Sequence, residues 1–175
     1  MDDFGATVDQ WHDVFTILGT AAVTLLGLLF VAMSLRDDIR DLSDNQYLKR
    51  MTSQNLTSFV TVFLMSVFFM IPDASADGIA ISIIATITAP LVNSLRSIGL
   101  YWRELPTDRG LFVWYGVVQP LCYLAALVAA ILLGRYEESA LSAMLTVMIF
   151  LLLIPTNNAW QLTASRHRDA PRSGS

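Results

Sequence analysis

The sequence predicts an all-α protein: an integral membrane bundle of five transmembrane helices, with the N-terminus outside and the C-terminus in the cytoplasm. Composition is the first indication, since 54% of the 175 residues are hydrophobic, 15% are charged, and the mean hydropathy is +0.54. A typical soluble domain is less apolar. The second indication is that the apolar runs are long and uninterrupted, and the third is that basic residues gather in alternate connections.

The clearest apolar run is Val14–Leu35, which holds 22 residues without a charge. At about 1.5 Å per residue, a helix of this length crosses a hydrocarbon core of roughly 30 Å. Four further runs of comparable length follow. Each is expected to be helical, because backbone groups within lipid must find their hydrogen-bond partners inside the segment. The expected spans are 14–35, 54–71, 78–100, 111–134 and 139–161, which together make one transmembrane domain, 14–161.

The basic residues predict an orientation. With five helices threaded alternately, one side of the membrane receives four Lys and Arg from 36–53, three from 96–110 and three from the C-terminal tail. Those ten leave only Arg135 of the eleven for the other side. Short cytoplasmic loops are enriched in Lys and Arg. We therefore predict that the basic side is cytoplasmic, with 1–13 an acidic extracytoplasmic tail and 162–175 a disordered basic cytoplasmic tail.

The N-terminal tail also bears on processing. It carries four aspartates and no basic residue, the reverse of the positive region that opens a secretory signal peptide. The first helix is therefore expected to be retained.

Small residues recur along the first expected helix. They leave two readings open: a seam where another helix packs closely, or a strip that lines a pore. Packing at small residues is the usual case in membranes, which favours the seam. The residues of this candidate seam are Thr16, Gly19, Thr20, Thr24 and Gly27.

Polar residues mark the third, fourth and fifth expected helices. On the predicted topology, the amides among them fall in the cytoplasmic half, and amides in hydrocarbon mark interiors or water-filled cavities. One reading is a cytoplasm-facing vestibule or pore; the other is hydrogen bonding between helices near the interface. Arg96 by itself is more typical of an anchor that reaches to the interface. The candidate vestibule comprises Ser82, Thr86, Asn93, Arg96, Gln119 and Asn157.

The sequence lacks the residues and motifs that several kinds of chemistry require. No Asp, Glu or His lies within the five expected spans, which disfavours proton-coupled transport. The sequence holds no HExxH, GxSxG or P-loop motif, and its one cysteine, Cys122, can form neither an internal disulfide nor a cysteine metal cluster. No basic patch interleaved with aromatic residues indicates nucleic acid. We expect no enzyme, no cofactor, no metal site and no nucleic-acid partner.

The first helix resembles a known sequence pattern. Trp11-His12, then Gly19–Ala22 and Leu26–Leu35, form a W…GTAA…LLGLLFVA-S arrangement. This resembles the opening helix of a family of small bacterial multi-pass membrane proteins whose activity is uncharacterised. The resemblance implies a bacterial inner membrane and a shared packing seam. It brings no catalytic residue.

Two functions remain as expectations. The first is a non-enzymatic, multi-pass inner-membrane component that acts through helix–helix assembly with itself or with partner membrane proteins. The alternative is an oligomeric small-solute or ion channel, lined by polar residues of the third and fourth helices. Uncharged hydroxyls and amides can line a weakly selective pathway. The expected partners are the lipid bilayer and either a second copy or another membrane protein.

Overall fold

The computed structural model describes residues 2–34, 46–72, 75–101, 117–135 and 139–169. Side chains are described for 10–34, 52–72, 75–96, 117–135 and 139–157. Five helices fill these ranges: α1 (Asp2–Ser34), α3 (Gln46–Phe69), α4 (Ala76–Tyr101), α6 (Gln119–Leu133) and α7 (Ser139–Asp169). No strand occurs in this part of the chain. The predicted all-α class and the number of helices are confirmed.

Four of the five helices are long and apolar enough to cross a membrane. Their spanning parts are Gln10–Ser34, Thr52–Phe69, Ala76–Arg96 and Ser139–Asn157. The helix α6 is shorter, with 15 residues, and so extends about 22 Å along its axis. It covers only part of the expected span 111–134, of which residues 111–116 lie outside the described residues.

Helix ends differ from the ends of the expected spans. The helix α1 already begins at Asp2, within the segment expected to be a tail, and α7 continues to Asp169. Residues 162–169, expected to be disordered, are therefore helical. Both additions lack proline, and Pro171 follows soon after the end of α7. The physical reason is that apolar composition marks where a helix leaves the lipid, whereas the helix itself continues while its backbone bonds can form.

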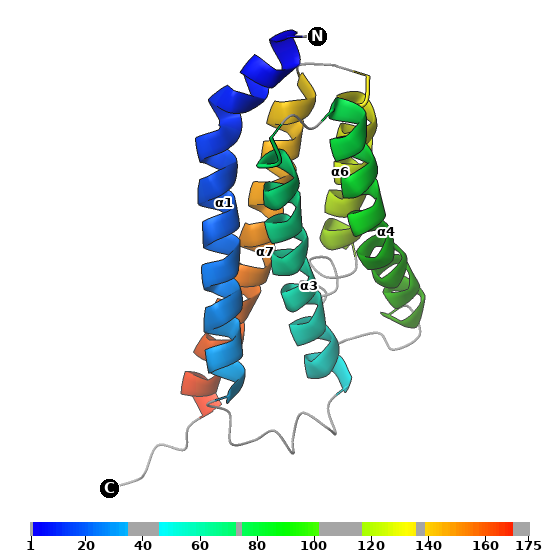
Figure 1. Ribbon diagram of the computed structural model, residues 1–175. Helices are drawn as coiled ribbons and strands as arrows, with labels where there is room; N and C mark the ends of the chain where they lie inside the picture. The colour runs from blue at the N-terminus through cyan, green and yellow to red at the C-terminus, as the bar shows by residue number, and fades with distance from the viewer. Residues whose placement is uncertain (1, 35–45, 73–74, 102–116, 136–138, 170–175) are drawn as a thin grey trace, which may run out of the picture.

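The five helices form a bundle whose central members are α3 and α7 (Figure 1). On one side, α1 packs mainly against α3 and also touches α7; on the other side, α6 packs against both α4 and α7. Successive helices run in alternate directions, so the two chain ends lie at opposite ends of the bundle (Figure 1). This arrangement places α1 farthest from α4 and α6.

Polarity accounts for the central position of α3. Among the four spanning helices, α1 is the most apolar and has the smallest buried share, whereas α3 is the least apolar and is half buried. Lipid tails are as apolar as Leu, so apolar side chains gain little by leaving lipid, while polar ones gain hydrogen-bond partners inside the bundle. The buried polar residues of α3 are Gln54, Asn55, Ser58, Thr61 and Ser66.

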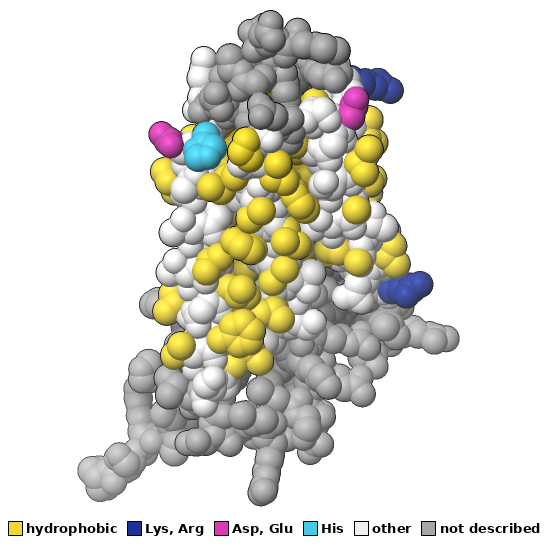
Figure 2. Space-filling view, in the orientation of Figure 1, with side chains coloured by type: hydrophobic (Ala, Val, Ile, Leu, Met, Phe, Trp, Pro, Cys, Tyr) yellow, Lys and Arg dark blue, Asp and Glu magenta, His cyan; other side chains and the backbone are white. Residues whose placement is uncertain are grey.

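Charged side chains and histidine lie toward the ends of the bundle. On the visible face they flank a broad zone of hydrophobic and uncharged side chains (Figure 2). All such groups with described side chains are exposed, as lipid immersion of the zone between them requires. These groups are His12, Asp13, Asp77, Arg96 and Arg135.

Candidate functional site

A buried polar cluster joins α3 to α6. The side-chain amide of Gln119 donates from Nε2 to Ser58 Oγ over 3.0 Å. The same Ser58 oxygen lies 3.2 Å from the Tyr123 hydroxyl, at hydrogen-bond distance. The exposed fractions of Ser58, Gln119 and Tyr123 are 1%, 4% and 1%. Inside an apolar bundle, Ser58 therefore contacts two polar side chains that lie more than 60 positions away in the sequence.

Local helix geometry produces the cluster. Gln119 and Tyr123 are four positions apart on α6, and residues at this spacing share one face of a helix. Ser58 can contact both side chains because no described hydrogen bond joins its hydroxyl to a backbone carbonyl of α3. Most other hydroxyls in these helices bond to the carbonyl four residues earlier, as Thr61 does to Thr57 and Ser66 does to Val62. The Ser58 hydroxyl is thus available for a contact between helices.

The chemistry of the cluster is neutral hydrogen bonding. Its members supply two hydroxyls and one amide, groups that can both donate and accept. None of them is a carboxylate or an imidazole, the side chains most often used in acid–base catalysis and as metal ligands. The arrangement suits joining helices or holding a small neutral molecule.

Among the side chains that the structure describes, two buried oxygen atoms near the ends of their spans have no hydrogen-bond partner. They are Gln54 Oε1 on α3 and Ser94 Oγ on α4. The side chains of Gln54 and Ser94 are 6% and 4% exposed. An unpaired polar group in an apolar interior costs free energy. Each oxygen would therefore be stabilised by a hydrogen-bond donor.

The six residues of the candidate vestibule are distributed over different environments. Gln119 is buried in the polar cluster, whereas Asn93, Arg96 and Asn157 are exposed. Ser82 and Thr86 are half-buried, and both donate to carbonyls of their own helix, those of Gly78 and Ser82 respectively. The side-chain hydrogen bonds described for Ser82, Thr86 and Gln119 go to carbonyls of α4 or to Ser58, and to none of the other five side chains.

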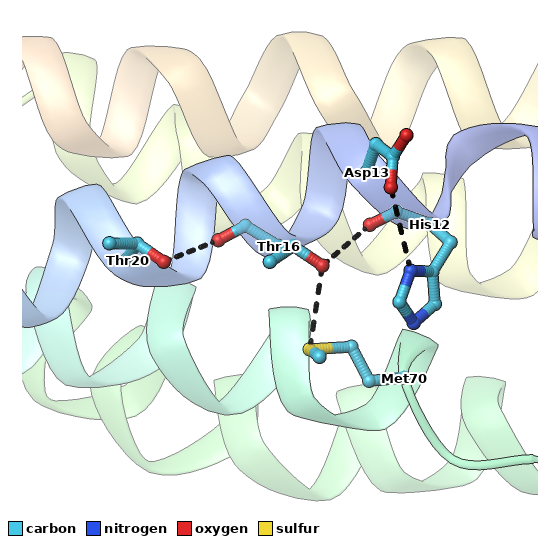
Figure 3. Close-up of polar contacts among 5 residues, drawn as sticks. All are labelled: His12, Asp13, Thr16, Thr20 and Met70. Carbon is cyan, nitrogen blue, oxygen red and sulfur yellow. Dashed lines mark hydrogen bonds and ion pairs between the residues drawn. The ribbon is translucent and has the colours of Figure 1, made fainter.

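The candidate seam of α1 divides into two parts. Gly19 is buried against α3: a Cβ atom placed there would lie 3.0 Å from Ser66 Cβ. One turn earlier, Thr16 lies at the edge of the same contact, with its hydroxyl 4.0 Å from the Met70 sulfur and donating to the His12 carbonyl over 2.9 Å (Figure 3). Gly19 therefore faces α3, and Thr16 lies half-buried at the edge of this contact.

The other three seam residues, Thr20, Thr24 and Gly27, face away from the bundle. All three are exposed, and a Cβ at Gly27 would have no atom within 4 Å. The two threonine hydroxyls donate to carbonyls of α1 itself, each over 2.8 Å. At 100° per residue these positions, together with Val31, fall within about 60° of one another on the side opposite the buried residues. We call Thr20, Thr24, Gly27 and Val31 the outer face of α1.

Sequence reasoning missed Ser58 as a site residue. The signal was present, because Gln54, Ser58 and Thr61 follow a four-then-three spacing that places polar groups on one face of the second expected helix. Gln119 and Tyr123 show the matching one-turn spacing on the fourth. The spacing does not determine which polar face packs against which other helix.

No protein-family model, no curated protein and no solved structure matches this chain. The class is therefore defined by the fold and composition alone. Five helices, four of them long and apolar enough to span, with charges toward the ends, define a helical membrane protein.

Proposed function

We propose that this chain is a non-enzymatic, multi-pass membrane component that assembles with a second copy of itself, or with a partner membrane protein, through the outer face of α1. The supporting observation is Gly27. It is exposed, and no described atom beyond the neighbouring backbone of α1 lies within 4 Å of the Cβ position.

Glycine within a helix costs about 1 kcal/mol relative to alanine. In a membrane helix the usual compensation is that it lets a second helix approach closely. Gly19 provides the precedent within this chain, since it receives Ser66 of α3 at close range. Gly27 has the same form about 80° around the axis of α1, and Thr20 and Thr24 continue a small-residue surface whose hydroxyls are already bonded within the helix.

The channel alternative receives less support. Its polar residues on α4, Ser82 and Thr86, bond to their own helix, and its residue on α6, Gln119, is engaged in the buried cluster. Flux across liposomes that contain the purified protein, measured with ions and small neutral solutes, distinguishes the two functions. Assembly without flux supports the proposal.

The test of assembly is substitution on the outer face. We expect Gly27→Leu and Thr24→Leu to weaken self-association in lipid at least about tenfold, which corresponds to about 1.4 kcal/mol, because a leucine side chain holds the second helix away. The association constant can be measured by energy transfer between labelled copies in liposomes.

The matched controls for this test lie on another exposed helix face. Thr88→Leu and Ala85→Leu make similar changes at exposed positions of α4 and should leave association unchanged. Equal weakening by both sets would contradict the proposal. If the wild type is monomeric by itself, disulfide or chemical crosslinking in the native membrane should capture a partner protein through Thr24→Cys in a Cys122→Ala background, and failure of both arms would refute assembly through this face.

We further propose a bacterial inner membrane with the N-terminus outside and the C-terminus in the cytoplasm. Support comes from the ten basic residues that fall on one side and from the opposite placement of the chain ends in the bundle. In a Cys122→Ala background, we expect Ser75→Cys to react with an impermeant thiol reagent from outside the cell. Ser43→Cys, in the basic connection, should react only after the membrane is opened. Reaction of both from the same side would overturn this orientation.

A further inference from the structure

In the polar cluster between α3 and α6, the structure describes no acceptor for the Ser58 hydroxyl when Tyr123 is the donor of their shared hydrogen bond. Ser58 and Tyr123 each carry one O–H group, and the contact between their oxygens uses one of the two. Ser58 also accepts from Gln119. When Tyr123 donates within the pair, the Ser58 O–H remains able to donate to a further acceptor. When Ser58 donates, the Tyr123 O–H has the side chains of Thr61 and Gln119 within hydrogen-bond reach.

An acceptor without a donor lies one helical turn away. Gln54 is four residues before Ser58 on α3, so the two side chains share a face, with Cβ atoms about 6 Å apart. Gln54 is 6% exposed, and its Oε1 atom has no partner among the described residues. A spare donor and a spare acceptor thus lie on the same side of one buried helix.

We propose that a single ordered water molecule binds at this point, accepting from the Ser58–Tyr123 pair and donating to Gln54 Oε1. Buried waters in proteins typically make two to four hydrogen bonds, and they occupy sites where polar groups would otherwise be unpaired. With this water bound, the contact between α3 and α6 would be hydrated. This proposal does not depend on assembly through α1.

The chemistry of the surroundings selects a neutral ligand. Every charged group whose side chain the structure describes is exposed, and none belongs to the cluster. A cation held there would lack a carboxylate to balance it, and burying an unbalanced charge is costly. Water supplies both the donor and the acceptor that the site needs without adding charge.

The test is transfer of magnetisation from water to side-chain amides, measured by NMR on the full chain in lipid nanodiscs. The chain holds five glutamines, so labelling of glutamine and asparagine gives few signals, and Gln54→Leu identifies that of Gln54. Where Gln54→Leu does not fold, Gln54→Met serves instead. We expect the Gln54 amide to receive transfer with the sign of a long-lived bound water. The exposed Asn157 amide should show only short-lived surface water, and the buried backbone amide of Ala126 none.

Two serine variants on α3 make the test specific. Ser58→Ala removes an anchor of the water and should abolish the bound-water transfer at Gln54, while the Gln54 amide signals persist. Ser66→Ala is the matched control, because Ser66 is equally buried but its hydroxyl bonds to the Val62 carbonyl; here the transfer should remain. Absence of bound-water transfer in the wild type, or its persistence in Ser58→Ala, would overturn the proposal.

Discussion

Substitution of Gly19 by leucine should separate α1 from α3 and lower the free energy of unfolding by about 1 to 3 kcal/mol, the usual cost of forcing extra carbon atoms into a packed contact. Even a single Cβ atom at this position would lie 3.0 Å from Ser66 Cβ and 3.4 Å from Ser66 Oγ. Leucine adds three more carbon atoms. Both atoms belong to Ser66, and its Cβ atom is attached directly to the backbone of α3. Rotation of one flexible side chain therefore cannot relieve the strain.

The measurement is reversible unfolding in mixed micelles, at a dilution where the chain is monomeric. Gly27→Leu is the matched control: the change is the same, on the same helix, but nothing lies within 4 Å, so the monomer should lose no stability. Gly19→Ala should lie between the two, and combining it with Ser66→Gly should recover part of its loss. If Gly19→Leu and Gly27→Leu have equal effects, the contact between α1 and α3 is not as close as the structure shows.

The stacked rings of Phe15 and Phe69 explain why this contact is expected to be sensitive. Their centroids are 4.1 Å apart with an angle of 7° between the planes, and both side chains are almost fully buried. Phe15 lies one turn before Gly19 on α1. Moving α1 outward to admit a leucine would therefore also disturb the ring contact, and dispersion contacts are a main source of helix association in lipid.

Replacing Gln119 by leucine should lower the free energy of unfolding by about 0.6 to 2 kcal/mol, the range for hydrogen bonds between membrane helices. The change removes the amide that donates to Ser58 over 3.0 Å and leaves a side chain of similar size in the same place. Ser58→Ala should cost a similar amount. The two changes together should cost less than their sum, since either one breaks the same hydrogen bond.

The control for this prediction is Asn157→Leu, which replaces an exposed amide and should have little effect on unfolding. The same variants answer the channel question. If Gln119→Leu abolishes a measurable flux across liposomes while unfolding is unchanged, the amide lines a pathway and does not join helices. Reduced stability without a change in flux is the result expected from the buried cluster.

The division of the α1 seam shows where sequence reasoning stops. Spacing identified Gly19 and Gly27 as equivalent small residues on one apolar helix. In the structure Gly19 contacts Ser66, whereas a Cβ at Gly27 would have no atom of another described helix within 4 Å. Their positions differ by eight residues, about 80° around the helix axis, which is enough to turn one toward α3 and the other away. The position of α3 determines which of the two glycines is in contact, and the sequence of α1 alone does not specify that position.

The polar residues of the later helices illustrate the same limit. Gln119 and Asn93 are both amides in apolar segments, and sequence alone gives them the same expected role. The structure buries Gln119 at 4% exposure and leaves Asn93 exposed. The side chains that Gln119 meets are determined by the packing of α6 near α3, which depends on contacts between residues more than 60 positions apart.

By itself, the sequence determined that this protein is helical and that most of its apolar helices are long enough to span a membrane; the five helices among the described residues agree in number with the five expected spans. These properties follow from local composition, because lipid leaves an apolar chain no other way to satisfy its backbone. The tertiary structure decided that the least apolar spanning helix lies at the centre, that Ser58, Gln119 and Tyr123 meet, and which face of α1 is free. These depend on helix rotation and close approach, which arise only when helices pack together.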